Sequence, residues 1–348
     1  MLYKPLPWLF LLPFLASAQT TTSCNPTEKT CPADTGLNTT LYTHDFTTSG
    51  ADPSTWTTTA GNVTSTPSGL LFTITKSGDA PTIRSKWSIF FGRVSFTLRT
   101  APGTGIVSSA ILQSSDLDEI DWEFLGGKTG MVETDYFGKG NATQGGREKD
   151  VAVTDAVSKS HNYTITWTKE NTQWLIDGVV MRTVMYADAL GGKNYPQTPM
   201  DVRIGSWAGG DSKNAKGTIE WAGGATDYSQ GPFVMVLEKV EVENYNPAVQ
   251  YAYGDLTGSW ESIVVGKGKG KEAQSESVSK SVSSVVSKTA SVTVATGTNA
   301  TVTQTVMKET AGASEIKVQA ASSNGAVLES GRYSVLVGLL VIFWALVV

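Results

Sequence analysis

Hydrophobic and polar residues alternate with a period of two in several segments of the chain. In Gly92–Thr100 the residues Val94, Phe96 and Leu98 alternate with polar residues, which is typical of a strand with one buried face. The segment His161–Thr168 alternates in the same way. Each segment therefore predicts a β-strand that packs one side against a second layer of structure.

Two further segments extend this pattern. The run Gln173–Met181 predicts two strands joined at Asp177-Gly178, a dipeptide that is a strong hairpin signal. The run Phe233–Tyr245 predicts another strand. Clusters of Gly, Pro and Asn separate these runs, and long helical periodicity is scarce. We therefore expect an all-β fold, a two-sheet antiparallel β-sandwich.

The first 18 residues have the pattern of a secretory signal peptide. One lysine precedes an apolar run that closes on Ala16-Ser17-Ala18, a small-x-small cleavage pattern. The run is short for a bilayer span, which needs about 20 apolar residues. We expect residues 1–18 to be removed.

The other end of the chain has the pattern of a glycosylphosphatidylinositol (GPI) signal. Small residues around Asn324 precede a polar spacer and an almost entirely apolar tail. A retained transmembrane helix is the alternative, but the tail is short for one and no basic flank follows it. We expect attachment at Asn324, removal of residues 325–348, and a lipid anchor in the membrane.

Composition divides the chain between these ends. From about Gly266 the sequence becomes rich in Ser, Thr, Val and Ala, with almost no aromatic residues before the tail. Such a segment buries too little apolar surface to fold. We expect a folded domain over residues 19–263 and a disordered, Ser/Thr-rich stalk over residues 264–324.

Covalent modification is also predicted from the sequence. The two cysteines, Cys24 and Cys31, follow the signal closely and are expected to form a disulfide in an oxidising compartment. Acceptor sequons for N-glycosylation occur at five asparagines, namely Asn38, Asn62, Asn141, Asn162 and Asn299.

Charge and residue counts exclude several classes of function. The net charge is −5 and no basic patch is visible, which argues against a nucleic-acid partner. The chain has only two histidines, and its two cysteines lie far from them, so no zinc motif is recognisable. The sequence also contains no Gly-x-Ser-x-Gly elbow, which a serine hydrolase would need. We expect no metal and no cofactor, so any chemistry must come from carboxylates. Ten tryptophans suit both core packing and stacking on sugar rings.

The segment Asp116–Phe124 is the most informative in the chain. If it is a strand, Glu119, Asp121 and Glu123 point to one face, and the apolar residues between them point to the core. Three adjacent carboxylates repel one another, so the pattern favours a functional role over a structural one.

Such carboxylates can divide the work of glycoside cleavage. A retaining mechanism needs a nucleophile and an acid/base about 5–5.5 Å apart. The Cα atoms of Glu119 and Glu123 would be about 13 Å apart on a flat strand, so curvature and inward-leaning side chains must close the difference. Asp121 lies between them and can hydrogen-bond to the nucleophile, so that the three titrate as a coupled set.

The segment Glu119-Ile-Asp-Trp-Glu123 resembles the E-x-D-x-E signature of glycoside hydrolase family sixteen, and its wider context resembles the fungal Crh group of cell-wall chitin–glucan transglycosylases. The resemblance covers most of the region from about residue 40 to residue 250, with further similar elements at Thr134–Gly138, His161–Trp167, Ile176–Gly178 and Arg203–Ala208. No cysteine-rich chitin-binding module, which some relatives carry, is visible.

This resemblance implies a concanavalin-like β-jelly roll with a concave substrate groove. It implies Glu119 as nucleophile, Asp121 as auxiliary carboxylate and Glu123 as general acid/base. It also implies a chitin donor and an acceptor that is chitin or β-glucan.

Four other residues are candidates for substrate binding. Gln113 on the preceding strand can face the groove, and Tyr136 follows the carboxylate strand closely. Trp207 and Trp221 are flanked by glycines, which suits loops that present an aromatic platform. Core packing is the alternative for each aromatic, and strand parity favours it for Trp122, Trp167 and Trp174.

Three hypotheses about function follow. The leading one is a secreted, GPI-anchored retaining transglycosylase that cleaves chitin and remodels the cell wall. A second keeps the same site but lets water accept the sugar, giving a β-glucanase or weak chitinase. A third is a non-catalytic wall lectin, which would not need three coupled carboxylates. We expect a monomer, because an enzyme that works on a polymer from a stalk needs no partner subunit.

Overall fold

The computed structural model describes residues 22–267, 292–296 and 300–304. The expected signal peptide (1–18), the sequon at Asn299, the attachment site at Asn324 and the tail (325–348) lie outside these residues. Within them, no helix is long and apolar enough to cross a membrane.

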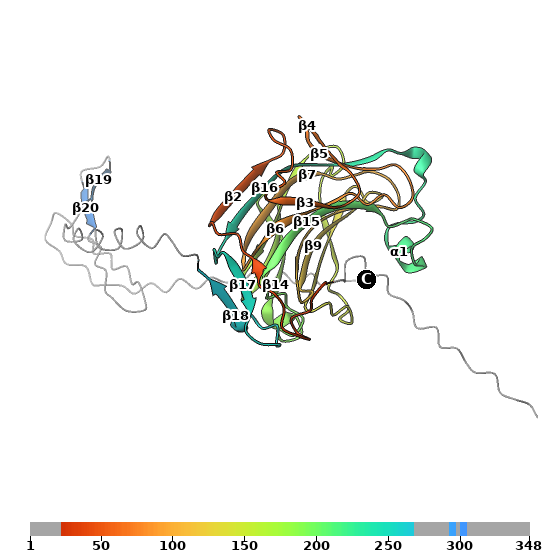
Figure 1. Ribbon diagram of the computed structural model, residues 1–348. Helices are drawn as coiled ribbons and strands as arrows, with labels where there is room; N and C mark the ends of the chain where they lie inside the picture. The colour runs from red at the N-terminus through yellow and green to blue at the C-terminus, as the bar shows by residue number, and fades with distance from the viewer. Residues whose placement is uncertain (1–21, 268–291, 297–299, 305–348) are drawn as a thin grey trace, which may run out of the picture. The chain divides into compact units, whose positions relative to one another are not determined.

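Two large antiparallel sheets form the folded domain, as the alternating pattern predicts. One sheet has seven strands, in the order β11 (Lys149–Ala152), β10 (Met131–Phe137), β9 (Glu119–Leu125), β8 (Ile106–Ser114), β15 (Met200–Ala208), β6 (Thr82–Ile89) and β3 (Trp56–Ala60). Figure 1 shows the two sheets as stacked, curved layers, with β6, β15 and β9 on the inner side of the curve. We call the solvent-facing side of the seven-stranded sheet the inner face.

The second sheet has eight strands and lies on the outer side of the curve. Its order is β14 (Val179–Met185), β13 (Asn171–Ile176), β12 (His161–Trp167), β7 (Gly92–Arg99), β16 (Phe233–Asn244), β5 (Gly69–Ile74) and β4 (Val63–Thr66), and β2 (Leu41–Asp45) pairs with β16. The hairpin predicted at Asp177-Gly178 joins β13 to β14, and both turn residues have positive φ, 49° and 82°. Positive φ at both positions is what a two-residue hairpin of this type requires.

The core lies between the sheets and is rich in aromatic side chains. Trp122 and Phe124 of β9 contact Tyr163 of β12, with ring centroids 5.4 and 4.7 Å away. Trp122, Trp167 and Trp174 are fully buried, as their strand parity predicts. Trp174 also donates a hydrogen bond from Nε1 to the carbonyl of Asp121 at 2.8 Å, which ties the outer sheet to the carboxylate strand.

Helices are few and short. The single α-helix in the described part of the chain is α1 (Lys216–Trp221), and the 3₁₀ turns are η1 (Tyr186–Asp188), η2 (Tyr228–Gln230) and η3 (Trp260–Ser262). A third, small sheet joins the two ends of the domain in the order β1 (Asp34–Thr35), β17 (Gln250–Tyr253) and β18 (Ile263–Gly266). Because β18 continues past Ile263, the folded domain extends beyond the predicted boundary at that residue.

A separate pair of strands lies in a second unit of the chain, Gly270–Val348. There β19 (Val292–Thr296) and β20 (Ala300–Gln304) pair with each other in an antiparallel sheet. These two segments differ from the expected stalk without regular structure. Their composition explains the difference, because Val and Thr are β-branched and favour strands.

The N-terminal disulfide is present, as predicted. Cys24 and Cys31 are bonded, with their Cα atoms 5.9 Å apart. Closing this short loop restricts the unfolded chain. We expect the double variant Cys24→Ser/Cys31→Ser to lose about 2 kcal/mol of unfolding free energy, as measured by urea denaturation. An unchanged unfolding midpoint would show that the loop contributes nothing to the stability of the domain.

The four sequon asparagines among the described residues differ in their exposure to solvent. Asn38 and Asn62 are exposed, and Asn141 and Asn162 are half-buried. Asn162 lies within β12, where its side chain accepts a hydrogen bond from Thr164 at 2.7 Å.

Candidate functional site

The three carboxylates of β9 share one face of the seven-stranded sheet. Ile120, Trp122 and Phe124 are buried in the core between the sheets, so strand parity turns Glu119, Asp121 and Glu123 to the inner face. The carboxylates are less open than expected, because Glu119 and Asp121 are only 9% and 3% exposed. Burial raises the pKa of Glu119 to about 7. Burial first, and then the neighbouring carboxylates, raise the pKa of Asp121 and of Glu123 well above the ordinary range.

Two neighbouring side chains hydrogen-bond to the carboxylate of Glu119. Gln113 on β8 lies opposite Glu119 in the sheet register and donates from Nε2 to one of its carboxylate oxygens. The side-chain amide oxygen of Gln113 in turn accepts from Arg203 of β15, whose Nε also donates to Asp201 at 2.7 Å. Asp121 hydrogen-bonds to Glu119 as well. The amide, the Asp121 hydrogen bond and the Arg203 charge all oppose the effect of burial on the pKa of Glu119.

Glu123 has the opposite surroundings. Its partner across the sheet is another acid, Glu133 of β10. After burial, the groups that act most strongly on Glu123 are all negative (Glu133, Glu119, Asp135 and Glu148), and each raises its pKa. The neighbours of Glu119 therefore mostly oppose the rise in its pKa, whereas those of Glu123 add to it. Such a difference lets two carboxyl groups on one strand take different roles, one as nucleophile and one as acid.

Two tryptophans lie on the same side of the sheet. Trp207 and Trp221 are both half-buried, with ring centroids 6.1 Å apart and planes inclined by 24°. Trp221 is the last residue of α1, and its Nε1 donates to both carboxylate oxygens of Glu133 at 3.1 and 3.3 Å. Trp207 belongs to strand β15, not to a loop as its flanking glycines suggested, and the sheet register brings it onto the inner face.

Tyr136 does not lie where it was predicted. It pairs with Ile120 in the register of β10 and β9, so it shares the core side of the sheet, and it is only 4% exposed. The guanidinium of Arg182 lies 5.5 Å from its ring. Its neighbour Phe137 pairs with Glu119 and is half-buried on the inner face. Tyr136 is therefore a packing residue, and the aromatic side chain of β10 nearest to the carboxylates is Phe137.

Comparison with known proteins agrees with this geometry. Residues 50–223 match the model of the family described as Glycosyl hydrolases family 16. Crh-like protein 5 of Aspergillus fumigatus is 54% identical over 249 residues, which are 72% of this chain and 63% of that protein. Crh-like protein 1 of the same species is 50% identical over 72% of this chain and 68% of the relative. The chain belongs to glycosyl hydrolase family 16 and is Crh-like.

Solved structures give the same result. The structure of a Crh5 transglycosylase in complex with NAG is 53% identical, has a TM-score of 0.68, and is matched over 70% of this chain and 99% of that one. A β-glucanase of Bacillus licheniformis, 24% identical with a TM-score of 0.50, is similar in fold. The chain spans 63% and 59% of the length of two curated relatives, Crh-like protein 5 of A. fumigatus and Crh-like protein 2 of Botryotinia fuckeliana.

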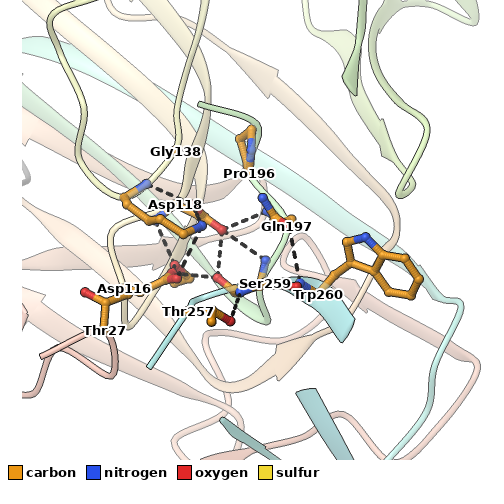
Figure 2. A network of polar contacts seen from close by, with 12 residues as sticks. Thr27, Asp116, Asp118, Gly138, Pro196, Gln197, Thr257, Ser259 and Trp260 are labelled. Atoms are coloured by element: carbon orange, nitrogen blue, oxygen red, sulfur yellow. Dashed lines mark hydrogen bonds and ion pairs between the residues drawn. The ribbon is translucent and has the colours of Figure 1, made fainter. Parts of the chain in front are cut away.

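A buried polar network supports the carboxylate strand β9 of this Crh-like protein at its N-terminal end (Figure 2). Asp118, immediately before Glu119, is fully buried and accepts hydrogen bonds from the backbone N–H groups of Lys139 (2.9 Å), Gln197 (2.7 Å) and Thr198 (3.0 Å). Burial and the charge of Asp116 raise the pKa of Asp118 to about 6. The Thr198 hydroxyl lies 2.6 Å from Asp116 and 2.8 Å from Asp118, and its single proton can be donated to only one of them.

The network links segments that are far apart in the sequence. Lys139, which follows β10, lies 3.7 and 3.5 Å from the carboxylates of Asp116 and Asp118. Gln197 accepts at its side-chain carbonyl from the backbone of Trp260, near the C-terminal end of the domain, at 3.3 Å. Between the aspartates, Leu117 has a φ of 67°, a conformation that costs a residue with a side chain about 1 kcal/mol or more. The hydrogen bonds of the network offset this strain and hold the turn that leads into Glu119.

Proposed function

We propose that this protein is a retaining transglycosylase, which cleaves β-1,4-linked chitin and transfers the released chain to chitin or β-glucan. The observation that carries the proposal is the contrast between two glutamates on one strand. Glu119 is held by an amide donor and a nearby guanidinium, whereas Glu123 has acidic neighbours. The first environment suits a nucleophile and the second a general acid.

The proposed reaction has two steps. In the first, the Glu119 carboxylate attacks the anomeric carbon, the glycosidic C–O bond breaks, and the proton of Glu123 passes to the departing oxygen. A glycosyl ester of Glu119 results. In the second, an acceptor hydroxyl attacks the same carbon, its proton passes to Glu123, and the ester bond breaks. Two inversions give net retention, and Asp121 stabilises Glu119 through its hydrogen bond.

The substrate class is supported by the relative and by the inner face. The Crh5 transglycosylase was solved in complex with NAG, which is N-acetylglucosamine, the repeating unit of chitin. The stacked tryptophans Trp207 and Trp221 provide apolar faces suited to sugar rings, and Gln113 acts by orienting Glu119.

The expected location suits this reaction. We propose that the protein is secreted and held by a GPI anchor at Asn324 at the outer face of the plasma membrane or in the cell wall, beside insoluble substrate. The Cys24–Cys31 disulfide suits an oxidising compartment.

The test is a transfer assay on the purified full-length chain. Chitin oligomers serve as donor, a fluorescent chitin or β-glucan oligomer serves as acceptor, and products are sized by mass spectrometry. Labelled products longer than the acceptor are expected. Shortened donor without labelled product would mean that water is the acceptor and the protein is a hydrolase. Binding without any product would mean that it is a lectin.

The aromatic pair gives a separate prediction. We expect Trp207→Ala to raise the apparent KM for the acceptor about fivefold, because the loss of one stacking contact costs about 1 kcal/mol. The matched variant Trp207→Phe keeps a ring and should raise KM less. Initial rates at varied acceptor concentration measure both. Equal KM values for the wild type and Trp207→Ala would exclude this tryptophan from the acceptor site.

A further inference from the structure

Glu133 is a further buried acidic residue of the inner face, and the proposed reaction does not yet use it. It stands directly opposite Glu123 in the antiparallel pairing of β10 and β9. Side chains paired in this way lie on the same face, with Cβ atoms about 4.5–5.5 Å apart. Glu133 is only 6% exposed, so water screens its charge poorly.

Trp221 fixes the carboxylate of Glu133. Its Nε1 lies 3.1 and 3.3 Å from the two carboxylate oxygens. The indole N–H is a donor only, so the contact favours the ionised form of Glu133. The same indole stacks on Trp207, which places the anchor of Glu133 within the aromatic pair.

Three cationic side chains in this region interact with acids other than Glu133. Arg147 forms an ion pair with Asp135 at 3.0 Å, and Lys128 forms one with Asp150 at 3.3 Å. The charge of Arg203 lowers the pKa of Glu119. The charged groups that act most strongly on Glu133 are all acidic (Glu148, Asp135 and Asp150). Burial and these charges raise the pKa of Glu133 to about 7, against the effect of the Trp221 hydrogen bond.

We propose that Glu133, held by Trp221, is a positioning residue that keeps the catalytic proton on Glu123. An anion beside Glu123 lets it remain protonated at higher pH, so that it can act as the acid in the first step. The same anion makes the Glu123 carboxylate a stronger base in the second step, when it takes the proton of the acceptor hydroxyl. This inference rests on the proposed role of Glu123 in transfer.

The test is Glu133→Gln, which keeps the shape of the side chain and removes its charge. We expect the alkaline limb of the pH–rate profile, which reports the loss of the Glu123 proton, to move down by about one pH unit or more. The rate at pH 8 should therefore fall about tenfold relative to the wild type, with little change at pH 5. Trp221→Phe, which removes the donor but keeps a ring, should move the limb in the same direction by less.

The matched control is Glu220→Gln. Glu220 neighbours Trp221 in α1, but its side chain is 66% exposed and paired with Lys216, so its profile should match that of the wild type. A superimposable profile for Glu133→Gln would overturn the proposal. A uniform loss of rate at every pH would also overturn it, because that loss would indicate a structural role.

A direct titration separates this proposal from the proposed function. In protein labelled with ¹³C at the glutamate side-chain carboxyl, the Glu123 signal is assigned from its absence in Glu123→Gln. We expect its pKa to fall in Glu133→Gln whether or not the protein transfers sugars. An unchanged Glu123 pKa would contradict the proposal even for an active transglycosylase, whereas a wild type that makes no product would contradict the proposed function alone.

Discussion

Glu119→Gln is expected to lower the rate of transfer by about four orders of magnitude or more, because the amide cannot form the glycosyl ester. Folding should survive, since Gln has the shape of Glu and the change removes one of several mutually repelling carboxylates. The measurement is the initial rate of labelled-product formation, with circular dichroism to confirm the fold. The exposed Glu220→Gln is the control and should keep full activity.

The roles of the two glutamates can be separated by added azide. In Glu119→Gly, azide should enter the space left by the carboxylate, attack the anomeric carbon and give a glycosyl azide of inverted configuration. In Glu123→Ala, a nitrophenyl donor needs no protonation, so the ester should still form and azide should release a product of retained configuration. The anomeric configuration is read by NMR. The reverse pattern would exchange the two roles, and a Glu119→Gln variant with more than about a tenth of wild-type activity would exclude the ester mechanism.

Strand parity explains how much of the site can be predicted from sequence. Within one strand, alternation is enough, and it correctly separates Glu119, Asp121 and Glu123 from the buried Trp122. The register between two neighbouring strands cannot be deduced from the sequence of either strand alone. A shift of one residue in the register of β10 would exchange the faces of Tyr136 and Phe137, so the sequence alone does not decide which of the two lies on the inner face.

The site residues that the sequence did not indicate make their contacts with residues on other elements. Glu133 and Trp221 are 88 positions apart and are joined by a hydrogen bond between the last residue of α1 and strand β10. Asp118 was part of an acidic run in the sequence, but its role depends on backbone N–H groups that follow β10 and precede β15. The sequence nevertheless contains a useful signal. Asp118 has the opposite strand parity from Glu119, Asp121 and Glu123, so it must find buried polar partners on the other side of the chain.

Among the variants proposed for this protein, Asp118→Ala is expected to lose the most unfolding free energy, about 3–5 kcal/mol. The substitution leaves three backbone N–H groups without their acceptor and removes one of the two carboxylates that pair with Lys139 (Figure 2). In a domain of this size the melting temperature should fall by about 10 °C. Asp118→Asn keeps one acceptor oxygen and should cost roughly half as much.

The same substitution should also reduce activity in the molecules that remain folded. Without the acceptor, the strained turn at Leu117 loses the hydrogen bonds that tie it to Lys139, Gln197 and Thr198, and Glu119 follows that turn closely. Urea denaturation measures the stability, and the rate at a temperature where the variant is fully folded measures the second effect. The control is the exposed Asp188→Ala, which should change the unfolding free energy by less than about 0.5 kcal/mol. If Asp118→Ala unfolds at the same urea concentration as this control, the network does not support strand β9, and the position of Glu119 must depend on its bonds to Gln113 and Asp121 and on the sheet register.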